Sequence, residues 1–296
     1  MKWDKNLIPN QKGEIIIVTG ASSGLGKETA RVLSKKQAEV IIAVRNLEKG
    51  KKVIEEMLNE NPNAKLTLKK LDLSNLQSVR EFSEDIINEY TQVNVLINNA
   101  GVMFSPYSET KDGFELQMGT NHFGHFALTG LLMPLLKKSD NSRVVMLSSS
   151  GHTMGNINFN DINWENRKYN PHKAYGDSKI ANLYFTYELV KKLERSANHP
   201  KVTVAHPGWT ATELQRHSGV MSVLNNFFAQ KVDMGILPIL RAAFDESAKP
   251  GDFFGPKDFF HMKGYPIKHR SNKLSYNMEK AKKLWGISEL MTGVKY

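Results

Sequence analysis

The amino-acid sequence predicts an α/β protein in which a doubly wound parallel sheet carries helices on both faces. Three observations indicate this fold. Apolar runs typical of strands alternate with amphipathic runs typical of helices from residue 14 onward. The first run, residues 14–19, is continuous and rich in β-branched residues, as expected for a strand that is buried on both faces. A glycine-rich turn, T19-G-A-S-S-G-L-G26, then leads from this strand into a helix.

The remaining elements follow in order along the chain. The first helix is predicted over 25–36, and Asn46 is placed to cap the second, which ends before the turn N61-P-N63. A capping box, S74-N-L-Q77, precedes a third helix whose apolar residues recur at helical spacing, namely Leu76, Val79, Phe82, Ile86 and Ile87. Long helices are predicted over 113–137 and 173–197. Further strands are predicted at 38–44, 64–71, 93–97, 143–147 and 201–205, and a short apolar run at 252–254 favours an edge strand.

The composition limits the classes of partner and site. The formal charge is +10, from 40 Lys and Arg against 30 Asp and Glu, but the lysines lie in scattered pairs, several of them on predicted helix faces. No basic stripe with interleaved aromatic residues accompanies them, so we expect a solvated cationic surface and no nucleic-acid partner. The absence of Cys excludes disulfides, thiolate metal sites and a cysteine nucleophile. Residues 1–10 lack the apolar region of a signal peptide and no run approaches the length of a spanning helix, which predicts a cytoplasmic protein without a membrane anchor.

The glycine-rich turn lies where an α/β fold binds a pyrophosphate, between a buried strand and a helix N-terminus. Gly20 permits a tight exit from the strand, Gly24 allows close approach of a phosphate, and Gly26 lets the helix pack on the sheet. Their spacing is GxxxGxG, which differs from the usual GxGxxG fingerprint. At the end of the second strand, where an acidic residue would bind a ribose 2′-hydroxyl, the chain has Arg45. Because an Arg there accommodates a 2′-phosphate, NADP(H) is the expected cofactor and NAD(H) is less favoured.

Tyr175 and Lys179 lie four residues apart in A174-Y-G-D-S-K-I180, on a predicted helix. Positions i and i+4 share one face of a helix, so the phenol and the ammonium should project toward one point. A Tyr beside a fixed cation is suited to donate a proton to a carbonyl oxygen while a nicotinamide dinucleotide supplies a hydride, which predicts an oxidoreductase. His122 and His125 have a spacing that permits metal binding, but no third ligand is placed, so no metal is expected.

Seven motifs occur in the order typical of the short-chain dehydrogenase/reductase family, which the chain resembles over residues 13 to about 212. They are T19-G-A-S-S-G-L-G26, D72-L73, N98-N-A-G101, Asn121, S148-S-S150, Y175-G-D-S-K179 and H206-P-G208. The runs D112-G-F-E-L-Q-M-G-T-N-H-F-G-H-F126, G264-Y-P and A281-K-K-L-W285 are similar to the retinol dehydrogenase and WW-domain oxidoreductase branch, and the N-terminus resembles its soluble bacterial members. The segment 154–167, which lengthens the separation between the serine run and Tyr175, is a further feature of the retinol dehydrogenase branch.

This resemblance implies roles for individual residues. Ser149 would polarise the carbonyl, Lys179 would hold the nicotinamide ribose and stabilise the phenolate of Tyr175, and Asn121 would fix a water that relays protons. Asp72 would contact the adenine, unless it is only a turn residue ahead of Ser74. The implied catalytic residues are thus Asn121, Ser149, Tyr175 and Lys179, with Ser148 and Ser150 as alternatives for the serine. The implied cofactor-binding residues are Gly20, Ser22, Ser23, Gly24, Leu25, Gly26, Arg45, Asp72, Leu73, Asn98, Asn99, Ala100, Gly101, Tyr175, Lys179, Pro207, Gly208, Thr210 and Thr212.

The resemblance therefore implies an NADP-preferring enzyme that interconverts an apolar aldehyde or ketone and its alcohol. We expect a single domain over 1–296, in which 13–212 bind the cofactor and carry the chemistry and 213–296 form the substrate loops and the C-terminal region. Residues that would line an apolar substrate pocket are Met221, Phe227, Phe228, Phe253, Phe254, Phe259 and Phe260. Family members are often dimers or tetramers, so a homodimer or homotetramer is implied.

Two other interpretations stay open at this point. A protochlorophyllide-reductase-like enzyme shares the Tyr and the Lys, but the absence of Cys argues against it. A non-catalytic, dinucleotide-sensing regulatory protein would keep the fold but is expected to lose Tyr175 or Lys179, and both are present.

Overall fold

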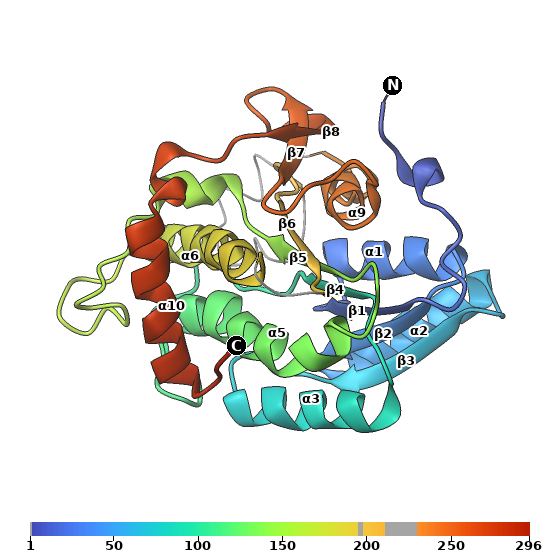
Figure 1. Cartoon of the computed structure of the whole chain (residues 1–296), viewed down its shortest axis with the longest axis horizontal. Helices are drawn as coiled ribbons and strands as arrows, with labels where there is room; N and C mark the ends of the chain where they lie inside the picture. Colours follow the sequence, from blue (N-terminus) through green and yellow to red (C-terminus); the bar gives the residue numbers. More distant parts are fainter. Residues whose placement is uncertain (1, 195–197, 211–229) are drawn as a thin grey trace.

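A sheet of eight strands runs through the protein in the order β3-β2-β1-β4-β5-β6-β7-β8 (Figure 1). The structure, a computed structural model, describes residues 2–194, 198–210 and 230–296. Neighbouring strands are parallel except for β7 and β8, which are antiparallel. The strands are β1 (Ile15–Thr19), β2 (Glu39–Val44), β3 (Lys65–Lys70), β4 (Val95–Asn98), β5 (Arg143–Leu147), β6 (Lys201–Ala205), β7 (Phe253–Asp258) and β8 (Lys263–His269).

Helices cover both faces of this sheet. The helices are α1 (Gly24–Lys35), α2 (Leu47–Glu60), α3 (Leu76–Glu89), α4 (Leu116–Met118), α5 (Gly124–Leu136), α6 (Pro171–Leu193), α8 (Val232–Gly235), α9 (Leu237–Phe244) and α10 (Met278–Thr292). Short helical turns are η1 (Lys5–Leu7), η2 (Gly119–Phe123), η3 (Ser150–Met154) and η5 (Lys273–Tyr276). Helices α1, α2 and α9 pack on one face, and α3, α5 and α6 pack on the other, with α10 lying against α6.

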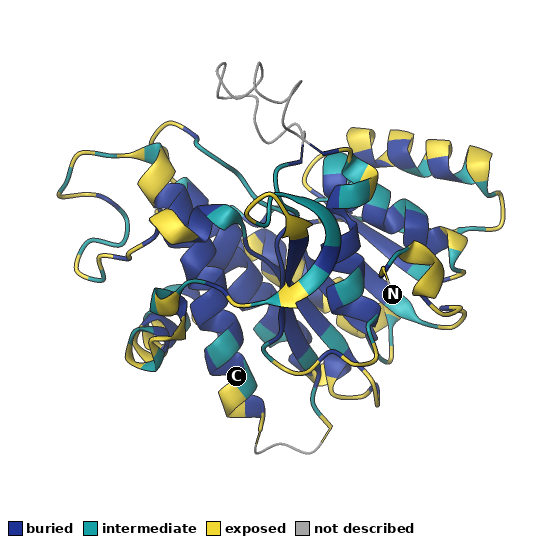
Figure 2. Ribbon diagram, turned by 90° about the horizontal axis from the view of Figure 1, so that it is seen from above, coloured by how far each residue is buried: buried dark blue, intermediate teal, exposed yellow. Residues whose placement is uncertain are grey.

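The apolar runs of the strands divide between two cores. Ile16 and Val18 of β1 contribute to the core under α1 and α2, whereas Ile17 contributes to the core under α5 and α6. Successive side chains of a strand point to opposite faces, so a strand covered on both faces must be apolar without alternation. Figure 2 shows the strands buried at the centre and the outer surfaces of the helices exposed. The predicted doubly wound α/β fold is confirmed, with one antiparallel strand added at its edge.

The chain reverses its direction across the sheet between β1 and β4, which are neighbours. It winds outward from β1 through β2 to β3 and then returns to β4 and continues the other way. In open α/β sheets a crevice forms outside the carboxyl ends of the strands at such a switch point. The segments that follow β1, β4 and β5 therefore meet at one edge of the sheet.

Most of the predicted elements occur close to the expected positions, and Asn46 caps α2 by accepting a hydrogen bond from the Lys49 N–H at 2.9 Å. The expected capping box is wrong. Asn75 is the N-cap of α3 and accepts from the Gln77 N–H, whereas the Ser74 hydroxyl donates to Asp72 at 2.6 Å. Ile87 of the same helix is 44% exposed and does not belong to its buried face.

Three longer-range expectations also differ from the structure. The helix expected over 113–137 is divided into α4, the π-helical turn η2 and α5. The helix expected over 173–197 begins at Pro171 and is described to Leu193. The run at 252–254 enters β7, which is not an edge strand because β8 pairs along its other side.

Candidate active site

A cavity of about 760 Å³ opens at the carboxyl ends of the parallel strands, within the size range of ligand sites. Segments that follow β1 to β6 all contribute to its wall. The sequence-predicted residues on this wall are Gly20, Ser22, Ser23, Gly24, Leu25, Gly26, Arg45, Asp72, Leu73, Asn99, Ala100, Gly101, Ser148, Ser149, Ser150, Tyr175, Lys179, Pro207, Gly208, Thr210 and Phe260. The fold thus brings together residues that are separated by most of the chain length.

The N-terminus of α1 opens onto this cavity with its first backbone N–H groups available. Ser23 is the N-cap residue, but its side chain makes no capping hydrogen bond. Gly24 has a φ of 53°, and a Cβ on Gly26 would lie 2.5 Å from the carbonyl oxygen of Gly20. Orphan N–H groups and the helix dipole at such a terminus favour an anion. These glycines and uncapped amides fit the pyrophosphate of a dinucleotide.

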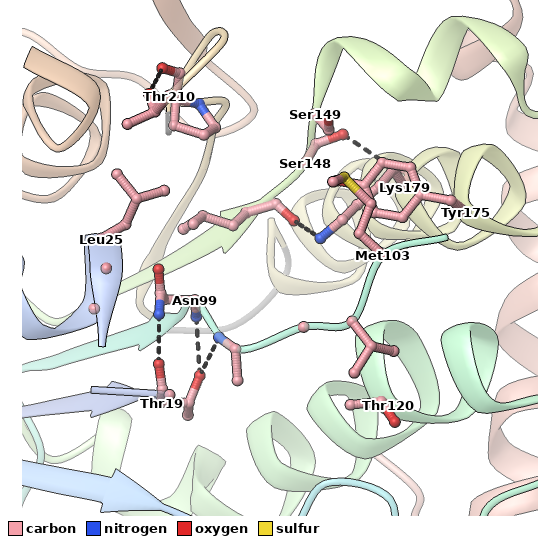
Figure 3. Close-up of a pocket in the computed structure, with 18 of the residues that line it drawn as sticks. Thr19, Leu25, Asn99, Met103, Thr120, Ser148, Ser149, Tyr175, Lys179 and Thr210 are labelled. Carbon is pink, nitrogen blue, oxygen red and sulfur yellow. Dashed lines mark hydrogen bonds between the residues drawn. The ribbon is translucent and has the colours of Figure 1, made fainter. Parts of the chain in front are cut away.

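Thr19 joins the ends of β1 and β4 beside this turn. Its hydroxyl oxygen accepts hydrogen bonds from the backbone N–H groups of Asn99 and Ala100, each at 2.9 Å. The Asn99 side-chain amide in turn donates to the Thr19 carbonyl oxygen at 2.7 Å, and these bonds are drawn in Figure 3. The two strand ends at the switch point are therefore fixed relative to each other where they face the cavity.

Two cations lie on the cavity wall near the end of β2. Arg45 follows β2, and Lys49 lies in the first turn of α2, with Asn46 between them in sequence. Both side chains are exposed, and neither forms an ion pair with a described residue. Lys49 was not predicted from the sequence as a cofactor-binding residue. Its position four residues after Arg45, at the start of a predicted helix, indicates that the two side chains lie close together. A pair of unpaired cations at this place suits a phosphate group.

Asp72 and Leu73 follow β3 and also line the cavity. Asp72 accepts hydrogen bonds from the Ser74 N–H at 3.0 Å and from the Ser74 hydroxyl through the same oxygen, Oδ1. Asp72 is therefore both a turn residue and a residue of the cavity wall.

Tyr175 and Lys179 lie on the buried face of α6. This helix begins at Pro171, and the Asn170 side chain caps it by accepting from the N–H groups of His172 and Lys173. The Lys179 ammonium lies 5.6 Å from the centre of the Tyr175 ring and donates to the Leu147 carbonyl oxygen at 3.3 Å. Figure 3 shows both side chains beside Ser148 and Ser149 on one side of the cavity, opposite Leu25. The expected juxtaposition of phenol and ammonium is present.

Burial changes the proton affinity of both groups. It raises the pKa of the Tyr175 hydroxyl to about 12, an effect that a hydrogen bond with the Ser149 side chain partly offsets. Burial lowers the pKa of the Lys179 ammonium to about 8. At neutral pH the phenol is therefore protonated and the ammonium still carries its charge.

The three serines after β5 have different surroundings. The Ser148 hydroxyl is buried and donates to the Lys179 carbonyl oxygen at 3.0 Å. Ser149 is the N-cap of η3, where its hydroxyl oxygen accepts from the Gly151 N–H at 3.1 Å. A Cβ on Gly151 would lie 2.8 Å from the Tyr175 ring, so this turn packs directly on the phenol. Of the three, Ser149 is the serine whose side chain interacts with Tyr175.

Asn121 lies behind the cavity wall and does not line it. It belongs to the π-helical turn η2, and its side chain bonds both backbone groups of Val102, accepting from the N–H and donating to the carbonyl oxygen. It also donates to Ser178 at 2.9 Å. A Cβ on Gly101 would lie 2.8 Å from Asn121 Oδ1 and 3.5 Å from Lys179 Nζ, so Gly101 separates the two residues. The geometry gives Asn121 a tethering role, and its part in a proton relay stays a prediction.

Several predicted residues do not line the cavity. Asn98 is buried and donates to Thr129 and Met146 in the core. Phe253 and Phe254 are core residues of β7, and Phe259 is 60% exposed. Thr212, Met221, Phe227 and Phe228 lie outside the described residues.

Other apolar side chains line the cavity instead. They are Met103, Phe104, Met154, Trp209 and Met262, together with the predicted Phe260. Met103 and Phe104 follow β4 and Met154 ends η3, so only the fold brings them to the same cavity as Trp209 and Met262. The apolar part of the cavity lining is thus richer in Met and aromatic residues than the sequence indicated.

His122 and His125 make core contacts. His122 Nε2 lies 2.8 Å from the Ser288 hydroxyl, and His125 contacts Thr19 and the Asn121 carbonyl oxygen. Among the residues that the structure describes, no group of three or more potential ligands is arranged to hold a metal ion.

The family model of the short chain dehydrogenases matches residues 14–221, and the chain belongs to this family. Within it, the chain is of the retinol dehydrogenase-like branch. It is 46% identical to retinol dehydrogenase 13 of Homo sapiens over 208 residues, which are 70% of this chain but only 62% of that protein. It is 38% identical to retinol dehydrogenase 12 of Mus musculus over 287 residues, which are 96% of this chain and 88% of that protein.

Solved structures support the same assignment. A crystal structure of an uncharacterized protein from Mycobacterium paratuberculosis is 36% identical, with a TM-score of 0.85 over 100% of this chain and 99% of that one. A short chain dehydrogenase from Escherichia coli CFT073 complexed with NADPH is 26% identical, with a TM-score of 0.66 over 82% of this chain and 96% of that one. Within the described ranges, no helix combines the length and the apolar character needed to span a bilayer.

Proposed function

We propose that the chain is an NADP(H)-dependent oxidoreductase that interconverts an apolar aldehyde or ketone and the corresponding alcohol. The observation that carries this proposal is the meeting of Tyr175, Lys179 and Ser149 at one side of a cavity whose other side suits a dinucleotide. The names of the relatives, retinol dehydrogenases, support an alcohol or carbonyl substrate.

The cofactor proposal rests on the charges at the end of β2. Arg45 and Lys49 would bind a 2′-phosphate, and no acidic residue stands beside Arg45 to take a ribose 2′-hydroxyl. Asp72 would contact the adenine, and the amides of the α1 N-terminus would bind the pyrophosphate. Solved neighbours complexed with NADP or NADPH support the same choice.

The chemistry follows from three side chains. When bound, the reduced nicotinamide supplies the hydride. The Ser149 hydroxyl donates a hydrogen bond to the carbonyl oxygen and polarises it, as oxyanion donors do. The Tyr175 hydroxyl, protonated at neutral pH, gives its proton to the oxygen as charge develops there. The Lys179 ammonium stabilises the resulting phenolate, and each pKa unit by which it lowers the phenol pKa is worth about 1.4 kcal/mol.

The protonation states at rest match carbonyl reduction. A buried phenol with a pKa of about 12 and an ammonium with a pKa of about 8 hold the proton that reduction requires. Alcohol oxidation needs the phenolate and should therefore become faster as the pH rises from neutrality.

The apolar wall defines the proposed substrate class. Met103, Phe104, Met154, Trp209 and Met262 line it, together with Phe260, which is 92% exposed. Flexible Met side chains and aromatic rings accommodate apolar groups of varied shape. A carbonyl compound with a long or bulky apolar tail fits this lining, whereas a sugar or a carboxylate does not.

A carbonyl panel tests this proposal. Aliphatic and aryl aldehydes, ketones and retinal, with a polar sugar aldehyde as the control, are incubated with NADPH or NADH while the absorbance of the reduced nicotinamide is followed. We expect NADPH oxidation with the apolar carbonyls, slower reaction with NADH and none with the sugar. Binding of NADPH without oxidation across the panel would contradict the proposal and favour a dinucleotide-sensing regulatory protein.

A further inference from the structure

His152 is held between the backbone of Ser149 and a segment near the C-terminus. It lies in η3, is 5% exposed and does not line the cavity. Its Nδ1 lies 2.6 Å from the Ser149 carbonyl oxygen, and its Nε2 lies 3.2 Å from the backbone nitrogen of Asn272. A carbonyl oxygen only accepts and a backbone N–H only donates, so the ring carries its proton on Nδ1 and accepts on Nε2. The contact with Asn272 therefore requires the neutral imidazole, because a protonated Nε2 cannot accept a hydrogen bond.

Asn272 is itself fixed by the turn that it begins. Its side chain caps η5 by accepting from the Ser275 N–H at 3.1 Å, and its carbonyl oxygen accepts from the Ser275 hydroxyl at 2.6 Å. The preceding residue, Ser271, bonds the Ser275 hydroxyl at 2.6 Å and thereby closes the turn. The N–H group that reaches His152 is therefore part of a rigid unit.

This unit is docked on α6, the helix that carries Tyr175 and Lys179. The Ser271 hydroxyl lies 2.8 Å from the hydroxyl of Tyr187 on α6. Tyr187 also stacks on Tyr276, with ring centres 5.0 Å apart. A continuous set of contacts thus runs from α6 through residues 271–276 and His152 to the backbone of Ser149.

We propose that His152 is a positioning residue that fixes the Ser149 hydroxyl relative to the Tyr175 phenol. The inference rests on the proposed function, in which both hydroxyls act on one carbonyl oxygen. Ser149 follows β5 and Tyr175 belongs to α6, so their separation depends on how two different elements are joined. Small displacements of groups that act together on a reacting atom have large effects on rate. His152 joins the two elements outside the cavity, where a bound substrate does not disturb it.

A double-mutant cycle between His152 and Ser149 tests this inference. The variants are His152→Leu, Ser149→Ala and the double variant, each measured in single-turnover experiments with enzyme in excess so that slow variants are still quantified. If His152 acts through the Ser149 hydroxyl, His152→Leu lowers the rate of the wild type on the order of tenfold and has little further effect in Ser149→Ala. The Kd for NADPH and the melting temperature show whether the cofactor site and the fold are intact.

Conservative variants separate the two contacts of the ring. An Asn side chain reaches about as far as Nδ1, so His152→Asn should keep the bond to Ser149 and recover part of the rate. A Gln side chain reaches about as far as Nε2, so His152→Gln should keep the Asn272 contact and recover less. His199→Leu is the matched control and should leave the rate unchanged, because within the described part of the chain the His199 ring bonds its neighbour Pro200 and does not line the cavity.

The double-mutant cycle shows separately whether His152 acts through Ser149 and whether Ser149 takes part in the reaction. Equal losses from His152→Leu in the wild type and in Ser149→Ala would show a purely structural role and overturn the inference alone. A Ser149→Ala variant as fast as the wild type would overturn both the proposed role of Ser149 and the inference drawn from it.

Discussion

Among the single residues of the cavity wall, the charged side chains and the apolar side chains belong to different segments. The cations Arg45 and Lys49 lie at the end of β2, whereas Met103, Phe104 and Met262 belong to the apolar lining. Lys179 is the cation buried beside the phenol, and burial has already lowered its pKa to about 8. In the proposed function, the exposed cations would bind the phosphorylated ribose of the cofactor and the apolar lining would bind the substrate.

The two exposed cations predict how cofactor selectivity will respond to mutation. Arg45→Gln should weaken NADPH binding by roughly tenfold, because a charge-assisted contact to phosphate is lost, and should affect NADH little. Lys49→Gln should have a smaller effect of the same kind. Titration of each variant with both cofactors measures this, and Lys52→Gln, on the same helix but away from the cavity, is the control. Equal losses for NADPH and NADH would contradict a 2′-phosphate site at Arg45.

Residue spacing made part of this site predictable. Tyr175 and Lys179 are neighbours on one helix and the glycines share one turn, so local geometry alone places them. Phe104 and Met262 line the same cavity only because β4 and the β7–β8 hairpin end at the same edge of the fold. No local pattern in the sequence carries that information. His152 was missed for the same reason, since Asn272 is 120 residues away from it in the chain.

At the scale of elements, close packing determines which segments can form the cavity wall. Helix α5 begins at Gly124 directly beneath the segment that follows β3, where Asp72 and Leu73 line the cavity. A Cβ on Gly124 would lie 2.4 Å from the Leu73 carbonyl oxygen, which is closer than real contacts allow. The position of this cavity segment therefore depends on a helix that does not itself line the cavity.

Gly124→Ala should consequently affect both stability and binding. We expect a loss of about 1–3 kcal/mol in the free energy of unfolding, as for other overpacked sites, and weaker NADPH binding as Leu73 moves. Gly286→Ala is the matched control, because Gly286 is exposed on α10 and an added Cβ meets nothing within 4 Å. That variant should be neutral or more stable by up to about 1 kcal/mol. Chemical unfolding compares the two, and equal stability of both variants would contradict the close contact at Leu73.

The elements that were not predicted depend on tertiary pairing. Strand β8 contains Gly264 and Pro266, which disfavour a strand in isolation, and it forms by pairing with β7 at the edge of the sheet. An edge position tolerates Pro because one side of the strand is unpaired. The π-helical turn in 113–137 was also beyond prediction, since its residues continue the apolar helical pattern on both sides.

For the whole molecule, buried histidines make the free energy of unfolding depend on pH. His122 and His125 lie in the core, where burial lowers the pKa of His122 to about 3 and that of His125 to about 4. His206 is also held well below its usual pKa by burial and by neighbouring His269. These rings are neutral in the native state under conditions in which the unfolded chain binds protons.

Stability should therefore decrease as the pH falls below about 6.5. In that range the histidines of the unfolded chain bind protons. In the native state His125 stays neutral until the pH approaches about 4, and His122 until it approaches about 3. Each such histidine lowers the free energy of unfolding by about 1.4 kcal/mol per pH unit. Asp177 has the opposite effect on stability. Burial raises its pKa to about 6, so on acidification the native state binds this proton at a higher pH than the unfolded chain does.

Chemical unfolding at pH values from 7.5 to 4.5 (about one unit apart) measures this balance. Among the described residues, the pKa is lowered for five histidines (His122, His125, His152, His206 and His269) and raised for four carboxyls (Glu14, Glu28, Glu115 and Asp177). Because the histidines outnumber the carboxyls, the net slope should be positive, with the highest stability at the neutral end. Constant or increasing stability on acidification would mean that these histidines are protonated in the native state.

Tyr175→Phe tests whether the Tyr175 hydroxyl donates the proton during carbonyl reduction. The change removes one oxygen and leaves the ring that packs on Phe104 and Gly151. Tyr184→Phe is the control and should retain activity. Tyr184 also lies on α6, and its hydroxyl donates to the Leu274 carbonyl oxygen. We predict that Tyr175→Phe lowers kcat by about 100-fold or more while the Kd for NADPH stays nearly unchanged. Turnover close to that of the wild type in Tyr175→Phe would show that the Tyr175 hydroxyl is not the proton donor.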